Sequence, residues 1–130
     1  MRFSVLASGS KGNMTYIQTP QTRLLVDAGI SFKEANLRID IDFSSIDAIL
    51  ITHEHHDHVC GLITMAKRSG ATIYVQEDTY NALKRKYKEK LIGLKVCIIE
   101  ANKKYQINDV RFLTLRLSHD SVSCLGFIFV

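Results

Sequence analysis

The sequence has no tryptophan, a single proline and three cysteines, and none of its apolar runs approaches the length that spans a membrane. No proline-rich linker, low-complexity tract or internal repeat divides the chain. The cysteines are odd in number and form no CxxC pair, which fits a reducing cytosol better than a disulfide scaffold. We therefore expect one domain over residues 1–130, in the cytoplasm and without a membrane partner.

The composition is that of an ordinary folded protein. The chain has 130 residues, of which 46% are hydrophobic and 23% are charged, which suffices for one buried core. Its formal net charge is +4, which favours anionic partners without fixing the fold. The opening MRFSVLASGS has one basic residue and a short apolar run, too little for a secretory signal.

Short β-branched and aliphatic runs predict strands at residues 3–7, 14–19, 23–27, 47–52, 72–75 and 96–100. Turn-forming stretches, SGSKGN and TPQT, separate the first three strands, which predicts an opening hairpin or meander. Apolar spacing predicts helices at about 31–39, 59–68 and 77–90. YQINDVRFLTLRLS predicts a hairpin around Asn-Asp, and CLGFIFV predicts a last strand. This alternation indicates a layered α/β fold.

Four of the five histidines crowd into THEHHDHVCG, the stretch that begins at Thr52. His53, His55, Asp57 and His58 form the pattern H-x-H-x-D-H between a predicted buried strand and a predicted helix, where α/β sheets usually place their sites. Imidazole and carboxylate ligands suit zinc and other first-row cations, whereas calcium and magnesium prefer oxygen ligands. The pattern predicts one or two transition-metal ions, with zinc the first choice and manganese the alternative.

Other residues near this pattern leave alternatives open. Glu54 and His56 occupy the x positions, so we expect them to be exposed or to support the ligands. His119, in RLSHDS, also follows a predicted strand and could complete a three-histidine set with His53 and His55. The competing interpretation of the histidine cluster is a solvated histidine-rich loop, and that of His119 is an ordinary surface histidine.

The segments LLVDAG, THEHHDH and LSHD, in this order, resemble the metallo-β-lactamase-fold hydrolases. The opening SVLASGSKGN is similar to the WalJ (YycJ)-type branch of bacterial metal-dependent phosphodiesterases and exonucleases. The resemblance implies an αββα sandwich, with Asp27 supporting the metal-binding loop without being a ligand. It implies that three histidines, His53, His55 and His119, hold a first metal ion. Asp57 and His58 would contribute to a second. Asp57 would also orient or deprotonate the attacking water.

Members of that family are roughly twice as long, and their later half supplies a metal-bridging aspartate and a last histidine. Here the chain stops at GFIFV, so we expect only the N-terminal half of the sandwich, with the second metal site in question. A half-sandwich leaves an apolar sheet face without a partner. We therefore expect either a homodimer that covers this face or a missing C-terminal half.

The substrate interpretation rests mainly on the resemblance. The basic stretch ALKRKYKEK could follow a phosphate backbone, although a solvated helix face explains it more simply. In SGSKGN, Ser8, Ser10 and Asn13 could cradle a phosphate, or the stretch could be only a turn.

Two hypotheses for the function follow from these features. The first is a metal-dependent hydrolase, a phosphodiesterase or exonuclease that acts on nucleic acid through a metal-activated hydroxide. The second is a non-catalytic metal-binding half-domain that lacks the ligands of the later half. The number of bound ions separates the two, because two ions require ligands that the sequence does not supply.

Overall fold

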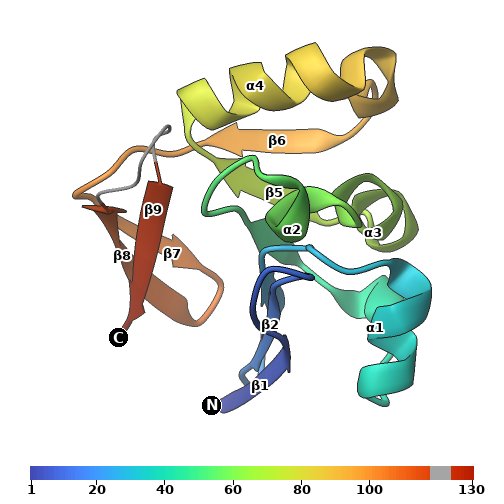
Figure 1. The fold of residues 1–130 in the computed structure, drawn as a ribbon. Coiled ribbons are helices and arrows are strands. Elements are labelled where there is room, and N and C mark those ends of the chain that lie inside the picture. The colour runs from blue at the N-terminus through green and yellow to red at the C-terminus, as the bar shows by residue number, and fades with distance from the viewer. Residues whose placement is uncertain (118–123) are drawn as a thin grey trace.

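The computed structural model describes residues 1–117 and 124–130. These residues form two β-sheets and one layer of helices (Figure 1). The strands are β1 (Arg2–Ala7), β2 (Met14–Gln18), β3 (Arg23–Val26), β4 (Ala48–Leu50), β5 (Thr72–Val75), β6 (Lys95–Ile98), β7 (Lys104–Ile107), β8 (Val110–Leu117) and β9 (Cys124–Phe129). The helices are α1 (Phe32–Arg38), α2 (His56–Val59), α3 (Leu62–Ser69) and α4 (Glu77–Tyr87), with short 3-10 turns η1 (Phe43–Ser45) and η2 (Lys88–Leu91).

The larger sheet has the strand order β1-β2-β3-β4-β5-β6, which follows the order of the chain. Its first three strands are antiparallel, and β3, β4, β5 and β6 are parallel. Parallel neighbours need crossover connections, which the helices supply between β3 and β6. The carboxyl ends of β3, β4 and β5 therefore meet at one edge of the sheet, where ligands usually bind in α/β proteins.

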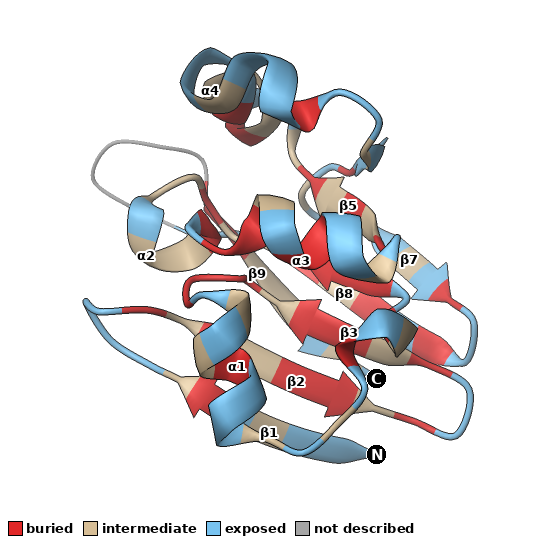
Figure 2. Cartoon of the chain, turned by 90° about the vertical axis from the view of Figure 1, so that its right-hand side faces the viewer, coloured by how far each residue is buried: buried red, intermediate tan, exposed pale blue. Residues whose placement is uncertain are grey.

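Figure 2 shows that much of the inner strands of the larger sheet is buried, and their apolar side chains belong to two separate cores. Toward the helices, Leu25 and Ile49 pack in a core that includes Leu62 and Met65. Toward the small sheet β7-β8-β9, a second core contains Ile17, Leu24, Leu50, Val110 and Phe112. Strands buried on both faces carry continuous apolar runs, which explains the sequences of β3 and β4.

The predicted elements are largely confirmed, with two corrections in the helices. The helix expected at 59–68 is two helices, α2 and α3, interrupted at Gly61. The interruption has a tertiary cause, because the Gly61 amide donates to Ala28 O at 2.8 Å, and a Cβ on Gly61 would lie 2.0 Å from Ile30 O. The helix expected at 77–90 ends at Tyr87, because Lys88 has a φ of 52° and η2 follows.

The predicted Asn-Asp hairpin turn is confirmed, since Ile107 pairs with Val110 and Asn108 adopts a positive φ of 51°. Asp109 accepts hydrogen bonds from the hydroxyls of Thr19 and Thr22, both at 2.6 Å, so the turn is attached to the β2–β3 connection. These bonds lower the pKa of the Asp109 carboxyl. None of the helices in the described part of the chain is long and apolar enough to span a membrane.

Candidate metal centre

The histidine loop, residues 52–58, runs from the end of β4 into α2 at the carboxyl edge of the parallel strands. His53 is buried, and its ring centroid lies 4.6 Å from that of His55 and 3.9 Å from that of His58. The fold thus gathers three of the imidazoles that the sequence singles out. His119 lies outside the described residues, so its position remains a sequence-based prediction.

Asp27 ties the two ends of the histidine loop together. It follows β3, is only 3% exposed, and has a φ of 63°, a conformation that aspartate tolerates better than most residues. Its Oδ1 accepts from the Thr52 amide at 2.8 Å, and its Oδ2 accepts from the Thr52 hydroxyl at 2.7 Å. The same Oδ2 contacts His58 Nδ1 at 2.5 Å. Asp27 therefore supports the loop through Thr52 and His58, in the place where the sequence puts such a residue.

These contacts assign the ring protons of His53 and His58. The Thr52 hydroxyl gives its single proton to Asp27, so at His53 Nδ1, 3.1 Å away, it accepts a hydrogen bond. His58 Nδ1 donates to the Asp27 carboxylate in the same way. Each neutral ring then has an unprotonated Nε2, which is the form in which histidine binds a metal.

The electrostatic environment of His58 favours a positive charge. Burial lowers the pKa of His58, but the hydrogen bond that His58 Nδ1 donates to Asp27 and the charges of Asp27 and Asp57 more than offset this, so the pKa is raised above its usual value. A cation bound near His58 Nε2 would lie on the side of Asp57, whose Oδ2 is 3.6 Å from that nitrogen, while Asp27 contacts the opposite ring nitrogen. Because a metal must displace any proton from Nε2, its binding should weaken at acid pH.

Asn13 links the SGSKGN loop to the histidine loop. Its amide nitrogen lies 3.1 Å from Asp57 O, 3.3 Å from Asp57 Oδ2 and 3.3 Å from His58 Nε2. Its backbone amide donates to Asp57 O at 2.7 Å. Ser8 and Ser10, the other two residues suggested for phosphate binding, are exposed. Sequence reasoning missed this link, because the spacing of Asn13 and Asp57 along the chain gives no sign of contact.

The donor chemistry fits a divalent transition metal, and the ligands within the described residues form pairs. His53 and His55 supply imidazole nitrogens, while His58 Nε2 and Asp57 Oδ2 lie 3.6 Å apart. In the residues that the structure describes, no three histidine, cysteine, aspartate or glutamate side chains form a group that could hold an ion.

The two x-position residues differ in their surroundings. His56 is exposed, as expected for a residue outside the metal set. Glu54 is half-buried, and its buried Oε2 has no hydrogen-bond partner among the residues that the structure describes. Burial first, then the charges of Asp27 and Glu54, raise the pKa of Cys124, whose sulfur lies 3.7 Å from His53 Nδ1. Glu54 therefore adds negative charge around the histidine loop.

The layers, the strand order and the histidine loop at the sheet edge define a metallo-β-lactamase-fold protein. A diphosphatase of the PhnP family superposes with a TM-score of 0.80 at 22% identity, over 98% of this chain and 61% of that one. The metallo-β-lactamase-fold protein YhfI of Bacillus subtilis superposes with a TM-score of 0.78 at 16% identity, over 98% of this chain and 56% of that one. At such identities the likeness establishes the fold alone.

The family follows from the sequence itself. Residues 22–130 match the model of the β-lactamase superfamily domain, and the chain belongs to that family. It is 39% identical over 126 residues to the exodeoxyribonuclease WalJ of Streptococcus pneumoniae, covering 94% of this chain and 47% of the relative. It is 36% identical to the exodeoxyribonuclease YycJ of Bacillus anthracis, covering 99% of this chain and 50% of the relative. The chain therefore spans about half the length of these relatives.

Proposed function

We propose that this chain provides the metal-binding half of a hydrolase that cleaves phosphodiester bonds, an exonuclease acting on nucleic acid. The observation that carries the proposal is the hydrogen-bond network of Asp27 and Thr52, which engages Nδ1 of His53 and of His58 and leaves Nε2 of each neutral ring as the nitrogen that can bind a metal. A solvated histidine-rich loop would need no such network. The relatives named exodeoxyribonucleases supply the substrate class.

The residues that would hold the ions are those singled out by the sequence. His53 and His55, with His119 as the third ligand, would hold the first, and Asp57 and His58 would contribute to the second. Zinc suits this donor set best, with manganese as the alternative. A bound divalent ion lowers the pKa of water and neutralises charge on a phosphoryl oxygen, so hydrolysis needs no side-chain nucleophile.

The other residues of the site would position these groups. Asp57, whose carboxylate is about one-third exposed, would orient the attacking water and accept its proton. Asp27 and Thr52 would keep His53 and His58 in the tautomer that binds metal. Asn13 would hold Asp57 in place from the other side, through its bonds to the Asp57 carbonyl and carboxylate.

An apolar groove beside the histidine loop supports the proposal that a further protein segment packs against this chain. Its volume is about 440 Å³, it runs between β1–β3 and β9, and His53 and His58 are among the residues that line it. Phe3, on its wall, is 55% exposed, which is unusual for a large apolar side chain beside a site. We propose that either a second copy of the chain or a C-terminal half, such as the longer relatives have room for, covers this groove. Sedimentation of the purified chain separates the two, because only the first gives a dimer.

The alternative function is a non-catalytic metal-binding half-domain. It is supported by the finding that, within residues 1–117 and 124–130, no three histidine, cysteine, aspartate or glutamate side chains form a group that could hold an ion. A cytoplasmic location is proposed for either function, supported by three cysteines that are all free thiols.

Hydrolysis of a chromogenic phosphodiester by the purified, zinc-loaded chain tests the proposed function. His55→Ala should abolish turnover, and His56→Ala, which removes an exposed neighbouring imidazole, should leave it unchanged. Undiminished turnover in His55→Ala would refute the proposed site. Bound metal without turnover in the unaltered chain would favour the half-domain.

A further inference from the structure

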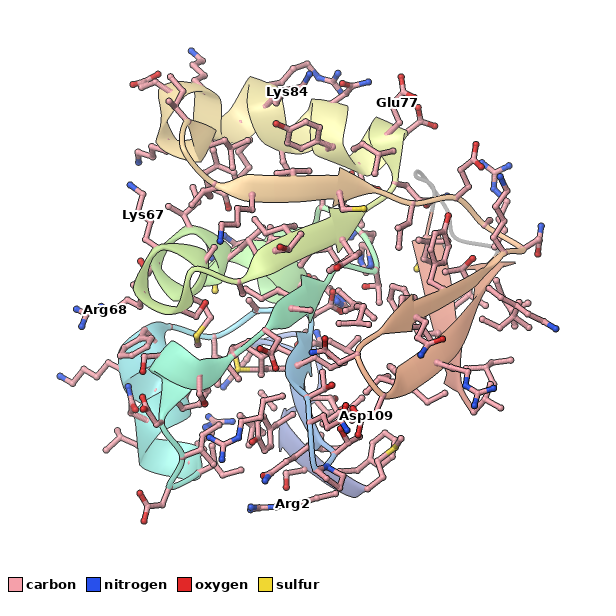
Figure 3. All side chains as sticks on the ribbon, turned by 180° about the vertical axis from the view of Figure 1, so that it is seen from behind. Arg2, Lys67, Arg68, Glu77, Lys84 and Asp109 are labelled. Carbon is pink, nitrogen blue, oxygen red and sulfur yellow. The ribbon has the colours of Figure 1, made fainter. Side chains whose placement is uncertain are left out.

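The positive charge of this protein is concentrated at one end of the helix layer. The C-terminal half of α4, η2 and the first residue of β6 contribute six exposed cations: Lys84, Arg85, Lys86, Lys88, Lys90 and Lys95. The last turn of α3 adds Lys67 and Arg68, and Lys67 and Lys95 line the same surface pocket. Figure 3 shows Lys67, Arg68 and Lys84 projecting from these helices. We call these eight residues the basic end.

The charge count separates the basic end from the rest of the protein. Its segments, residues 62–69 and 83–95, contain one acidic residue, Glu89. The whole chain has 17 lysines and arginines and 13 acidic residues, so removing eight cations and one acid leaves nine against twelve. The basic end therefore carries a net charge of about +7 and the remainder about −3. The net charge of +4 is thus a local feature.

These cations are arranged so that their charge stays available. Among the described residues, none of the eight forms an ion pair with a carboxylate. Three are held by aromatic faces instead: Arg68 lies 4.8 Å from the ring centre of Phe32, Lys84 lies 4.9 Å from that of Tyr80, and Lys86 lies 5.3 Å from that of Tyr87. An aromatic face orients a cation without neutralising it.

Helix dipoles account for only part of this arrangement. Cations are favourable in the last turn of a helix, which would explain Lys67, Arg68 and residues 84–86. The same preference in α1 yields one cation, Arg38, which pairs with Glu34 at 3.1 Å. Lys90 and Lys95 lie beyond the end of α4, where its dipole gives no such benefit.

The basic end lies at the end of α4 that is farther from the histidine loop. Glu77 begins α4 directly after β5, at the same edge as the loop, and the basic last turn is at the other end of the helix. At 1.5 Å per residue, the 11 residues of α4 and the eight of α3 extend about 16 Å and about 12 Å.

We propose that the basic end binds the phosphate backbone of the nucleic-acid substrate roughly four to five base pairs from the bond that is cleaved, at 3.4 Å per base pair. This inference rests on the proposed phosphodiesterase function for its substrate class. In this proposal the basic end contributes to the affinity for nucleic acid and takes no part in the chemical step. A small phosphodiester that fits the histidine loop cannot reach it.

Binding of a fluorescent duplex of about 20 base pairs, measured by anisotropy in EDTA over a range of salt concentrations, tests the proposal. The double variant Lys86→Glu/Lys90→Glu should flatten the slope of log Kd against log salt by about 2, and should weaken binding about 30-fold near 0.15 M salt. The matched control is Lys104→Glu/Arg111→Glu, which makes the same charge change on the small sheet and should change the slope by much less. Both double variants should hydrolyse the small phosphodiester at the rate of the unaltered chain.

Each other outcome has a distinct meaning. An unchanged salt slope, an equal loss in the control variant, or binding to phosphatidylserine vesicles without binding to the duplex would overturn the proposal. A chain that hydrolyses the small ester and binds no duplex would overturn the basic end alone. A chain that binds the duplex through the basic end without ester hydrolysis would contradict the proposed function and leave the basic end intact.

Discussion

Replacing Thr52 by valine tests the network that prepares the histidines. Valine has nearly the same shape as threonine and lacks the hydroxyl, so the Thr52 amide can still donate to Asp27. The change removes the 2.7 Å bond to Asp27 Oδ2 and the acceptor 3.1 Å from His53 Nδ1. His53 is 5% exposed, and losing a hydrogen bond to a buried polar group costs about 1–3 kcal/mol. We expect the free energy of unfolding of the metal-free chain to fall by about that amount.

The effect on metal binding should be larger than the effect on stability. Removing a residue that orients a metal-binding histidine typically weakens metal affinity by about 10–100-fold. Competition against a chromophoric zinc chelator gives this affinity, and urea unfolding gives the stability. Thr52→Ser keeps the hydroxyl and loses only the methyl group, so its zinc affinity should stay close to that of the unaltered chain. Equal zinc affinities for the valine and serine variants would refute the reasoning.

Two further substitutions, the first with a matched control, test how the histidine loop and the Asn-Asp hairpin are held. Gly61→Ala should destabilise the chain by about 1–3 kcal/mol in urea unfolding, because its Cβ would meet a backbone oxygen at 2.0 Å, whereas Gly126→Ala meets only a leucine side chain at 3.1 Å or more and should cost less. Asp109→Asn should lower the unfolding midpoint at neutral pH. The pKa of the Asp109 carboxyl in the folded chain lies below its ordinary value of 3.8, so the carboxylate stabilises the unaltered chain above that pH. The difference in unfolding midpoint between the two proteins should therefore shrink as the pH falls below 3.8. A difference that does not change with pH would contradict this.

The sequence predicted most of the architecture because the fold depends on local patterns. The apolar runs of β3, β4 and β5 and the Asn-Asp turn before β8 are visible without any knowledge of distant contacts. The break between α2 and α3 is not visible in this way. It results from the close approach of Gly61 to the backbone at Ile30, a contact made by two segments far apart in the chain.

In the candidate site, too, local patterns are visible in the sequence and contacts between distant segments are not. The spacing of His53, His55 and His58 carries enough information to predict that their rings gather. Thr52 carries no such signal, since a threonine at the end of a strand is ordinary, and its role depends on Asp27 lying beside it. The extent of the basic end is likewise not visible in the sequence, because Lys67 and Lys95 come to line one surface pocket only in the folded chain.

The metal content per chain, determined by elemental analysis of the purified protein after dialysis against zinc, tests the central claim most directly. The proposed centre predicts at least one zinc ion per chain, lost in a His53→Ala/His55→Ala variant that remains folded and retained in His56→Ala. No bound ion in the unaltered chain, or equal zinc content in all three proteins, would contradict the claim that this histidine loop is a metal centre.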